Sequence, residues 1–210
     1  MAHAGGRDHQ AVRPRAAGPR RVSGVAEIEE VSQTHPTTLR TDRLHLVAAT
    51  PELLRAHLES FAALSTVLDA EVDAMPSDLE DSNLQWSLEA FERNPAAAGW
   101  LMWYFVLQLE DGGRRLVGVG GYKGPPSEGG TVEVGYAVVE DEQGNGYATE
   151  ATTELVRHAF DDDRVRAVIA ETYPALVLSI GVLEKCGFAC VGKGSSDGGL
   201  RYAFLRGWLE

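Results

Sequence analysis

The chain has few cysteines and no long hydrophobic run. Its two cysteines, Cys186 and Cys190, are separated by three residues, and no second pair is present to complete a zinc site. This spacing argues against the disulfide framework of a small secreted protein and favours simple packing of free thiols in a reducing cytoplasm. No stretch approaches the roughly 18 apolar residues that would predict a membrane span.

Basic residues are also in short supply. The chain holds 19 Lys and Arg against 31 Asp and Glu, a net charge of −12. Residues 1–21 contain five arginines and one aspartate, so the remainder is even more acidic than the total. A body with this charge argues against nucleic acid as the main partner, because phosphate binding needs Lys and Arg.

The first 36 residues differ from the rest in composition. They are rich in Arg, Gly, Pro and Ala and lack the apolar centre of a secretory signal. Because such a composition cannot bury enough apolar surface to order itself, we expect a disordered leader or an upstream extension of the reading frame. An arm that binds nucleic acid is the alternative.

The rest of the sequence is that of one globular domain, residues 37–210. Of all residues 44% are hydrophobic and 24% charged, which is typical of a soluble protein. Alternation, helical spacing and turn residues predict the order β-α-α-β-β-β-α-β-α-β-β. Strands are expected at 39–49, 100–110, 114–124, 131–139, 165–172, 188–194 and 201–209, and helices from Thr50-Pro51 to Phe61 and at 79–93, 147–160 and 179–185. The fold class is therefore α/β (α+β), with an antiparallel meander in the middle.

The stretch DEQGNGYATEAT, residues 141–152, places two glycines between a strand and a helix. The first main-chain N–H groups of a helix have no partners inside it, and with the helix dipole they suit an anion such as a pyrophosphate. Gly144 and Gly146 would allow close approach and positive φ. A plain loop with a helix cap is the alternative. The glycines at 118–124 are followed by Pro125-Pro126, so no phosphate-binding helix can start there.

Four motifs in order resemble the GNAT acetyltransferase superfamily. Residues 143–148 (QGNGYA) match its Q/R-x-x-G-x-G/A signature, and GYKGPP (121–126), TVEVGYAV (131–138) and LEKCGF (183–188) have the spacings of a branch similar to the ribosomal-protein alanine N-acetyltransferases. The resemblance covers residues 37–210. It implies a mixed, mostly antiparallel sheet of about six to seven strands flanked by about four helices.

The resemblance also implies acetyl-CoA as co-substrate, with no metal. The loop would hold the pyrophosphate through Gln143, Gly144, Asn145, Gly146, Tyr147, Ala148 and Thr149. Amides near Ala137 and Val138 would bind the pantetheine arm and the thioester carbonyl, in a gap opened by a bulge in their strand. The acceptor would be a primary amine, either a protein N-terminus or a small molecule, and relatives often form homodimers.

Two residues are candidates for the chemistry. Glu133 lies on the cofactor strand and would remove a proton from the amine, since only a neutral amine attacks; the alternative is a solvent-facing residue or an ordinary cross-strand pair. Ser179 would donate to the departing thiolate, and its alternative is a helix cap. The family usually has an Asn and a Tyr where this chain has Leu176 and Leu183, so the resemblance does not supply the acid or that part of the cofactor contacts.

The segment between Arg55 and Arg93 has acidic residues and no basic ones, and it would form one wall of the acceptor cleft. A negative field there would attract a cationic amine, although a solvated face is the alternative. The acidic residues are Glu59, Asp69, Glu71, Asp73, Asp78, Glu80, Asp81, Glu89 and Glu92. Aromatic residues that either pack in the core or line the cleft are Trp86, Trp100, Trp103 and Tyr104, and alternation would point Trp100 and Trp103 to opposite faces.

His57 and His158 lie on helix patterns without ligand spacing and are expected to be structural. Two other functions stay open at this point. One is a non-catalytic acyl-CoA binding module, suggested by Leu176 and Leu183. The other is a protein-interaction domain that keeps only the fold.

Overall fold

The computed structural model describes residues 38–208, which lie within one compact unit, 34–210. Its strands are β1 (Thr38–Arg40), β2 (Leu44–Ala48), β3 (Met102–Gln108), β4 (Arg114–Tyr122), β5 (Thr131–Val138), β6 (Ala167–Thr172), β7 (Ala189–Lys193) and β8 (Leu200–Leu205). Its helices are α1 (Pro51–Glu59), α2 (Phe61–Leu68), α3 (Asp81–Arg93), α4 (Tyr147–Phe160) and α5 (Val177–Lys185). The predicted N-terminal leader falls outside the described residues.

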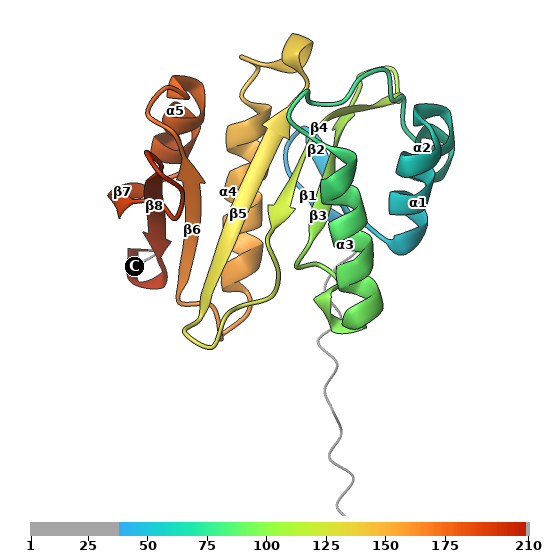
Figure 1. Cartoon of the computed structure of the whole chain (residues 1–210). Helices are drawn as coiled ribbons and strands as arrows, with labels where there is room; N and C mark the ends of the chain where they lie inside the picture. Colours follow the sequence, from blue (N-terminus) through green and yellow to red (C-terminus); the bar gives the residue numbers. More distant parts are fainter. Residues whose placement is uncertain (1–37, 209–210) are drawn as a thin grey trace, which may run out of the picture. The chain divides into compact units, whose positions relative to one another are not determined.

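The strands form one mixed sheet in the order β1-β2-β3-β4-β5-β6-β8-β7 (Figure 1). Neighbours pair antiparallel except β5 and β6, which are parallel. The expected class and the central meander β3-β4-β5 are confirmed. The sheet has eight strands, one more than the upper expectation, and the described chain has one α-helix more than expected. Within residues 38–208 no helix has the length and apolar character needed to cross a bilayer.

The extra strand comes from the segment 39–49, which we predicted as a single strand. It divides into β1 and β2, which pair antiparallel around a turn. In that turn Thr41 N donates to Leu44 O (2.9 Å), and Leu44 N donates to Thr41 Oγ1 (2.9 Å). A Thr side chain that bonds the backbone of the turn reverses the chain where alternation alone suggested continuation.

The extra helix arises at Ser60. Helix α1 begins as expected, with Leu53 N donating to Thr50 Oγ1 (3.2 Å). Ser60 then ends α1 and caps α2, since Ala63 N donates to its Oγ (3.1 Å). Phe61 therefore starts a new helix and is 43% exposed, so its predicted place at the end of the first helix is wrong. Because a new helix starts at the cap, the residues after Ser60 no longer continue the i, i+3, i+4 pattern of α1 on which the prediction relied.

Two hydrophobic cores lie on opposite faces of the sheet. One contains residues of α4, α5 and the sheet, among them Leu155, Leu183 and Tyr202. The other contains residues of α1, α2, α3 and the sheet, among them Leu54, Leu84 and Tyr104. The layers are thus helix, sheet and helix, with α3 in front of the sheet and α4 behind it in Figure 1.

Trp100 and Trp103 pack against the same histidine. Trp100 and Trp103 are both buried in the first core, and both rings contact His158, with centroids 6.1 and 5.4 Å apart. Their predicted placement on opposite faces is wrong, because Trp100 precedes β3 and does not follow its alternation. His57 is also buried, and its Nδ1 lies 3.1 Å from the Tyr104 hydroxyl. Both histidines have the structural placement that we expected.

Candidate functional site

Strands β5 and β6 pair over three residues and then separate. The ladder runs from Thr131↔Ala167 to Glu133↔Ile169, whereas β5 continues to Val138 and β6 to Thr172. Figure 1 shows the two strands diverging toward their carboxyl ends. Backbone groups of β5 beyond Glu133 are thereby released from pairing on that side.

The bulge that we expected in β5 is not found in its pairing with β4 or β6. The pairing of β5 with β4 runs from residue 134 to residue 138 without a register shift. The register shifts of the described strands lie at Phe105/Val106 in β3 and at Cys190/Gly192 in β7. The opening therefore comes from the early end of the β5–β6 ladder.

The register also decides which amides of β5 face the opening. Lys123 N donates to Glu133 O (2.9 Å) and Val139 N donates to Val117 O (3.0 Å), so the odd-numbered residues exchange bonds with β4. The amide of Ala137 is then directed at β4, which corrects the expectation that it binds the co-substrate. The amide of Val138 faces the opening. The amide of Tyr136, which we did not name as a candidate, faces the same side.

The loop before α4 enters the site at the wide end of this opening. Gly144 and Gly146 both have left-handed backbones, with φ of 81° and 83°, as we anticipated. The first bond of the helix joins Glu150 N to Gly146 O (3.0 Å), and no side chain caps the helix. The amides of the first turn, residues 147–149, thus precede the first internal bond and point toward the end of the helix.

Side chains of the loop bond to carbonyls and not to the loop amides, although the amide of Gln143 itself donates to Glu140 O (3.2 Å). Gln143 Nε2 donates to Val138 O (3.2 Å), and Asn145 Nδ2 donates to Glu142 O (3.2 Å). A Cβ placed on Gly144 would meet no atom within 4 Å, so open space lies beside the loop. This is the arrangement that suits an anion, and the residues present fit a diphosphate group.

Glu133 lies at the apex of the opening. Its carboxylate forms an ion pair with the Lys123 ammonium, and its side chain is 23% exposed whereas that of Lys123 is 67% exposed. The two residues face each other across the β4–β5 connection. The ion pair is the cross-strand alternative that we considered for Glu133.

Three hydroxyl groups, from β5, β6 and α5, meet beyond the point where the two strands separate. Tyr136 OH donates to Ser179 O (3.0 Å) and lies 3.4 Å from Ser179 Oγ, while Thr172 Oγ1 donates to Ser179 Oγ (3.1 Å). Burial raises the pKa of Tyr136 to about 12, so its hydroxyl keeps its proton at neutral pH. Helix α5 begins at Val177, which places Ser179 inside the first turn and not at the cap.

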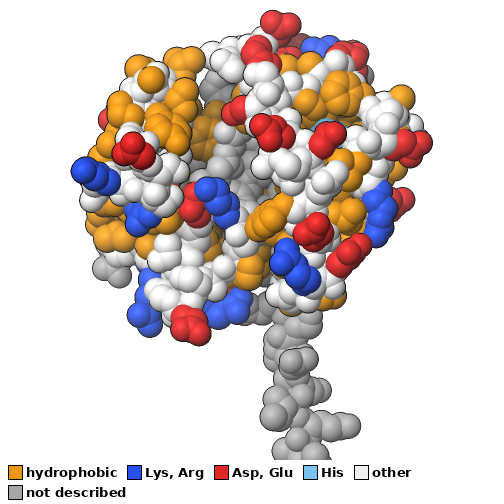
Figure 2. All heavy atoms as spheres, viewed as in Figure 1, with side chains coloured by type: hydrophobic (Ala, Val, Ile, Leu, Met, Phe, Trp, Pro, Cys, Tyr) orange, Lys and Arg blue, Asp and Glu red, His pale blue; other side chains and the backbone are white. Residues whose placement is uncertain are grey.

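The two leucines that replace family residues differ in their surroundings. Leu183 is 1% exposed and packs in the first core. Leu176 is 51% exposed and begins a hydrophobic surface with Val177 and Leu178, which are 70% and 77% exposed. Figure 2 shows a recess in the upper half of the molecule, with hydrophobic side chains on its left and acidic ones on its right.

The acidic segment is partly neutralised. Salt bridges in the described residues hold three of its nine carboxylates, in the pairs Asp69–Arg114 (2.9 Å), Glu71–Arg115 (2.9 Å) and Glu92–Arg55 (3.8 Å). Its connection between α2 and α3 reaches the end of β5, where Ser77 N donates to Glu140 Oε1 (3.1 Å). Trp86 on α3 is 43% exposed, whereas Tyr104 is fully buried.

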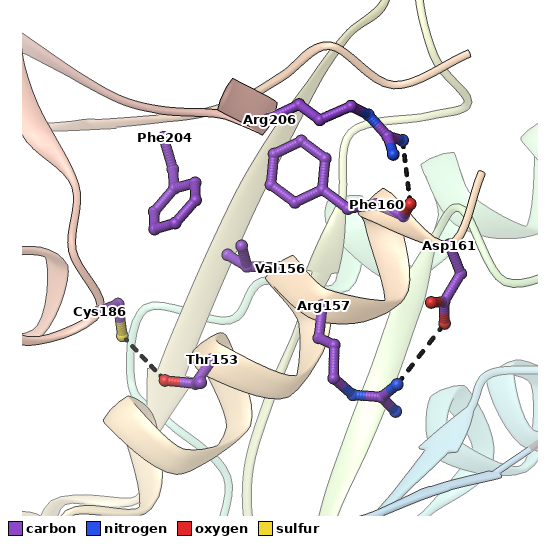
Figure 3. Close-up of a pocket in the computed structure, with 8 residues that line it drawn as sticks. All are labelled: Thr153, Val156, Arg157, Phe160, Asp161, Cys186, Phe204 and Arg206. Atoms are coloured by element: carbon purple, nitrogen blue, oxygen red, sulfur yellow. Dashed lines mark hydrogen bonds and ion pairs between the residues drawn. The ribbon is translucent and has the colours of Figure 1, made fainter. Parts of the chain in front are cut away.

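A cavity of about 360 Å³ lies elsewhere, on the far half of α4 (Figure 3). It is lined by Thr153, Val156, Arg157, Phe160, Asp161, Cys186, Phe204 and Arg206. None of these belongs to the loop or to β5, and Arg157 is paired with Glu154 (2.5 Å) and Asp161 (3.8 Å). We therefore place the site at the β5–β6 opening. Within residues 38–208 no group of three side chains is arranged to hold a metal ion.

Known proteins share this fold. Of the solved structures, the microcin C7 self-immunity acetyltransferase MccE, in complex with acetyl-CoA and AMP, has a TM-score of 0.57 at 16% identity, covering 84% of this chain and 99% of that one. RimL, a ribosomal L7/L12 α-N-protein acetyltransferase, has a TM-score of 0.55 at 15% identity, covering 81% and 93%. At such identities the likeness shows the fold alone.

Sequence comparison gives the family. The uncharacterized N-acetyltransferase YjdG of Bacillus subtilis (strain 168) is 29% identical over 100 residues, which are 48% of this chain. The match spans 58% of that curated relative. Residues 43–189 match the model of the acetyltransferase (GNAT) domain, which is more than half of the chain. This protein is therefore a member of the GNAT acetyltransferase family.

Proposed function

We propose that this protein transfers an acetyl group from acetyl-CoA to a primary amine, either a protein N-terminus or a small molecule. The observation that carries the proposal is the uncapped start of α4, with Gly144 and Gly146 in left-handed conformations, at the wide end of the β5–β6 opening. Two free thiols, Cys186 and Cys190, fit a reducing cytoplasm as the place of action.

Co-substrate binding falls to main-chain amides. Those of residues 144–149 hold the diphosphate, helped by the positive end of the α4 dipole, whereas the amide of Gln143 donates to Glu140 O (3.2 Å). The amide of Val138, with that of Tyr136 on the same side of β5, faces the pantetheine arm and the carbonyl oxygen. When bound, acetyl-CoA supplies the thioester. A preorganised donor to its carbonyl oxygen typically lowers the activation barrier by about 3 kcal/mol.

Glu133 acts as the base in this proposal. A cationic acceptor first loses one proton to bulk water, because only the neutral amine attacks. Glu133 then takes a second proton as the new N–C bond forms, and the C–S bond breaks with its electron pair going to sulfur. The ion pair with Lys123 holds the carboxylate in place, and a cationic acceptor displaces that pairing on arrival. The proton on Glu133 returns to the sulfur through water, so the free thiol is the second product.

Ser179 stabilises the departing sulfur. Its Oγ accepts a hydrogen bond from Thr172 Oγ1 (3.1 Å), which leaves its own proton free to point to another acceptor. Tyr136 fixes the same residue through its carbonyl (3.0 Å). In many family members a tyrosine at the position of Leu183 protonates the departing sulfur. In this protein Ser179 takes that role.

The acceptor enters beside the acidic connection between α2 and α3. Asp73 and Asp78 lie in this connection, which adjoins the end of β5. Their negative field speeds the arrival of cationic amines and is screened by salt. A cationic acceptor is therefore used faster than a neutral one, and added salt reduces the difference.

A non-catalytic acyl-CoA binding module is the second candidate. Leu176 and Leu183 favour it because both replace polar family residues, and the Lys123 ion pair favours it because it occupies Glu133. The release of free thiol from acetyl-CoA in the presence of a panel of peptides and small amines separates the two. Turnover with at least one acceptor, lost in Glu133→Gln, supports the enzyme; binding of CoA without turnover on any acceptor supports the module.

A further inference from the structure

The guanidinium of Arg43, in the turn between β1 and β2, holds the loop before α4. Arg43 Nε and Nη2 lie 2.8 and 2.7 Å from Glu150 Oε2, and Arg43 N donates to Glu150 Oε1 (2.9 Å). Arg43 Nη1 donates to Asn145 O (3.0 Å), and the guanidinium lies 4.7 Å from the centre of the Tyr147 ring. Thr41 Oγ1 adds a bond to Glu150 Oε1 (2.5 Å). All three guanidinium nitrogens thus contact the loop or the first turn of α4.

The bond to Asn145 O sets the direction of an amide. In a planar trans peptide the carbonyl oxygen of Asn145 and the N–H of Gly146 point to opposite sides. Because Arg43 fixes that oxygen on its own side of the loop, the Gly146 N–H is turned away from Arg43. Open space also adjoins the loop at Gly144. The peptide cannot flip without breaking this charge-assisted bond.

The bonds to Glu150 remove a competing charge. Glu150 lies in the first turn of α4, where its carboxylate competes with any other anion for the positive end of the helix dipole. Burial acts in the opposite direction, but the hydrogen bonds from Thr41 and Arg43 prevail and lower the pKa of Glu150, so it is ionised at neutral pH. An unpaired carboxylate there would repel a diphosphate, and Arg43 neutralises it.

We propose that Arg43 is a positioning residue for the diphosphate of CoA, because it orients the Gly146 amide and cancels the charge of Glu150. The inference rests on the proposed co-substrate. Sequence reasoning had no basis for it, since Arg43 and Glu150 are 107 residues apart.

The test compares two acetyl donors that differ in the diphosphate. We expect Arg43→Ala to weaken CoA binding in calorimetric titration by about tenfold, and to lower kcat/KM for acetyl-CoA by a similar factor. The kcat/KM for S-acetylpantetheine, which lacks the diphosphate, should stay within about twofold of the wild type. Arg43→Lys should fall between the wild type and Arg43→Ala, because it keeps the charge and loses the fork geometry.

Two further variants separate the parts of the proposal. Arg43→Ala combined with Glu150→Gln should recover part of the lost affinity, since the repulsion is gone while the Asn145 carbonyl is still unheld. Arg157→Ala is the matched control, because Arg157 also pairs with a carboxylate of α4, Glu154, and with Asp161 just after the helix, but does not touch the loop. This variant should bind CoA as the wild type does.

The proposal is overturned if Arg43→Ala binds CoA as tightly as Arg157→Ala. It is also overturned if Arg43→Ala loses as much kcat/KM with S-acetylpantetheine as with acetyl-CoA, which would mark a purely structural role. Failure of the wild type itself to bind CoA would instead refute the proposed function. The CoA titration needs no turnover, so it decides the binding part even without an acceptor.

Discussion

Two glycines with the same backbone and the same free space allow strain to be separated from binding. Gly144 in the loop before α4 has φ of 81°, and Gly112 in the β3–β4 turn has φ of 87°. A Cβ on either would meet no atom within 4 Å. Alanine at each position therefore costs only the left-handed strain, about 1–2 kcal/mol. For a domain of this size that corresponds to a fall in Tm of about 2–8 °C, equal in the two variants.

Their effects on CoA binding should differ. The methyl group of Gly144→Ala projects into the open space beside the loop, where the diphosphate is proposed to lie, and relaxation of the strain turns amides away. Loss of one charge-assisted amide bond is typically about 1.5–3 kcal/mol, so the Kd for CoA should rise at least about tenfold. Gly112→Ala should leave the Kd unchanged.

Thermal unfolding and calorimetric titration of both variants provide the measurement. Equal losses of Tm with a changed Kd in Gly144→Ala alone would support the assignment of the loop. The reasoning is refuted if Gly144→Ala binds CoA as the wild type does, or if Gly112→Ala loses the same affinity.

Three other outcomes are expected. Glu133→Gln should lower kcat about 100-fold without changing the Kd for CoA, since a general base contributes about that much; an unchanged kcat would exclude Glu133 as base. Tyr136→Phe should cost about 1 kcal/mol of unfolding free energy and slow turnover through Ser179, measured by denaturation and thiol release. Bonds from Ser195 and then Arg201 lower the pKa of Glu171 from 4.5 to about 2, so its contribution to stability is complete above pH 4.5 and is lost as the pH falls toward 2. Glu171→Gln should therefore be less stable at pH 7 and show a shallower loss of Tm between pH 5 and 2.

Local patterns were sufficient for the middle of the fold. The meander and α4 were predicted because alternation, a Gly-Gly turn and a helical stripe agree with one another there. The break at Ser60 was missed because the apolar spacing continues through it, and only the cap shows that the phase changes. The position of Trp100 was misjudged because alternation applies only inside a strand, and the strand starts at Met102.

The candidate site was only partly accessible to such reasoning. The left-handed glycines 144 and 146 follow from the order strand, glycines, helix. The contact of Tyr136 with Ser179 joins residues 43 apart, and no local pattern encodes it. The orientation of the Ala137 amide depends on the register with β4, and a shift of one residue would have reversed it.

The presence of two cores on opposite faces of the sheet has a consequence for how this protein can change. The first core contains residues of α4, whereas the helices next to the acidic connection belong to the second. Cavities or new side chains in the second core are therefore absorbed mainly on its own face, because packing defects relax locally. A library of variants in α1, α2 and α3 is thus the route to new acceptor preferences without loss of the proposed CoA-binding loop before α4.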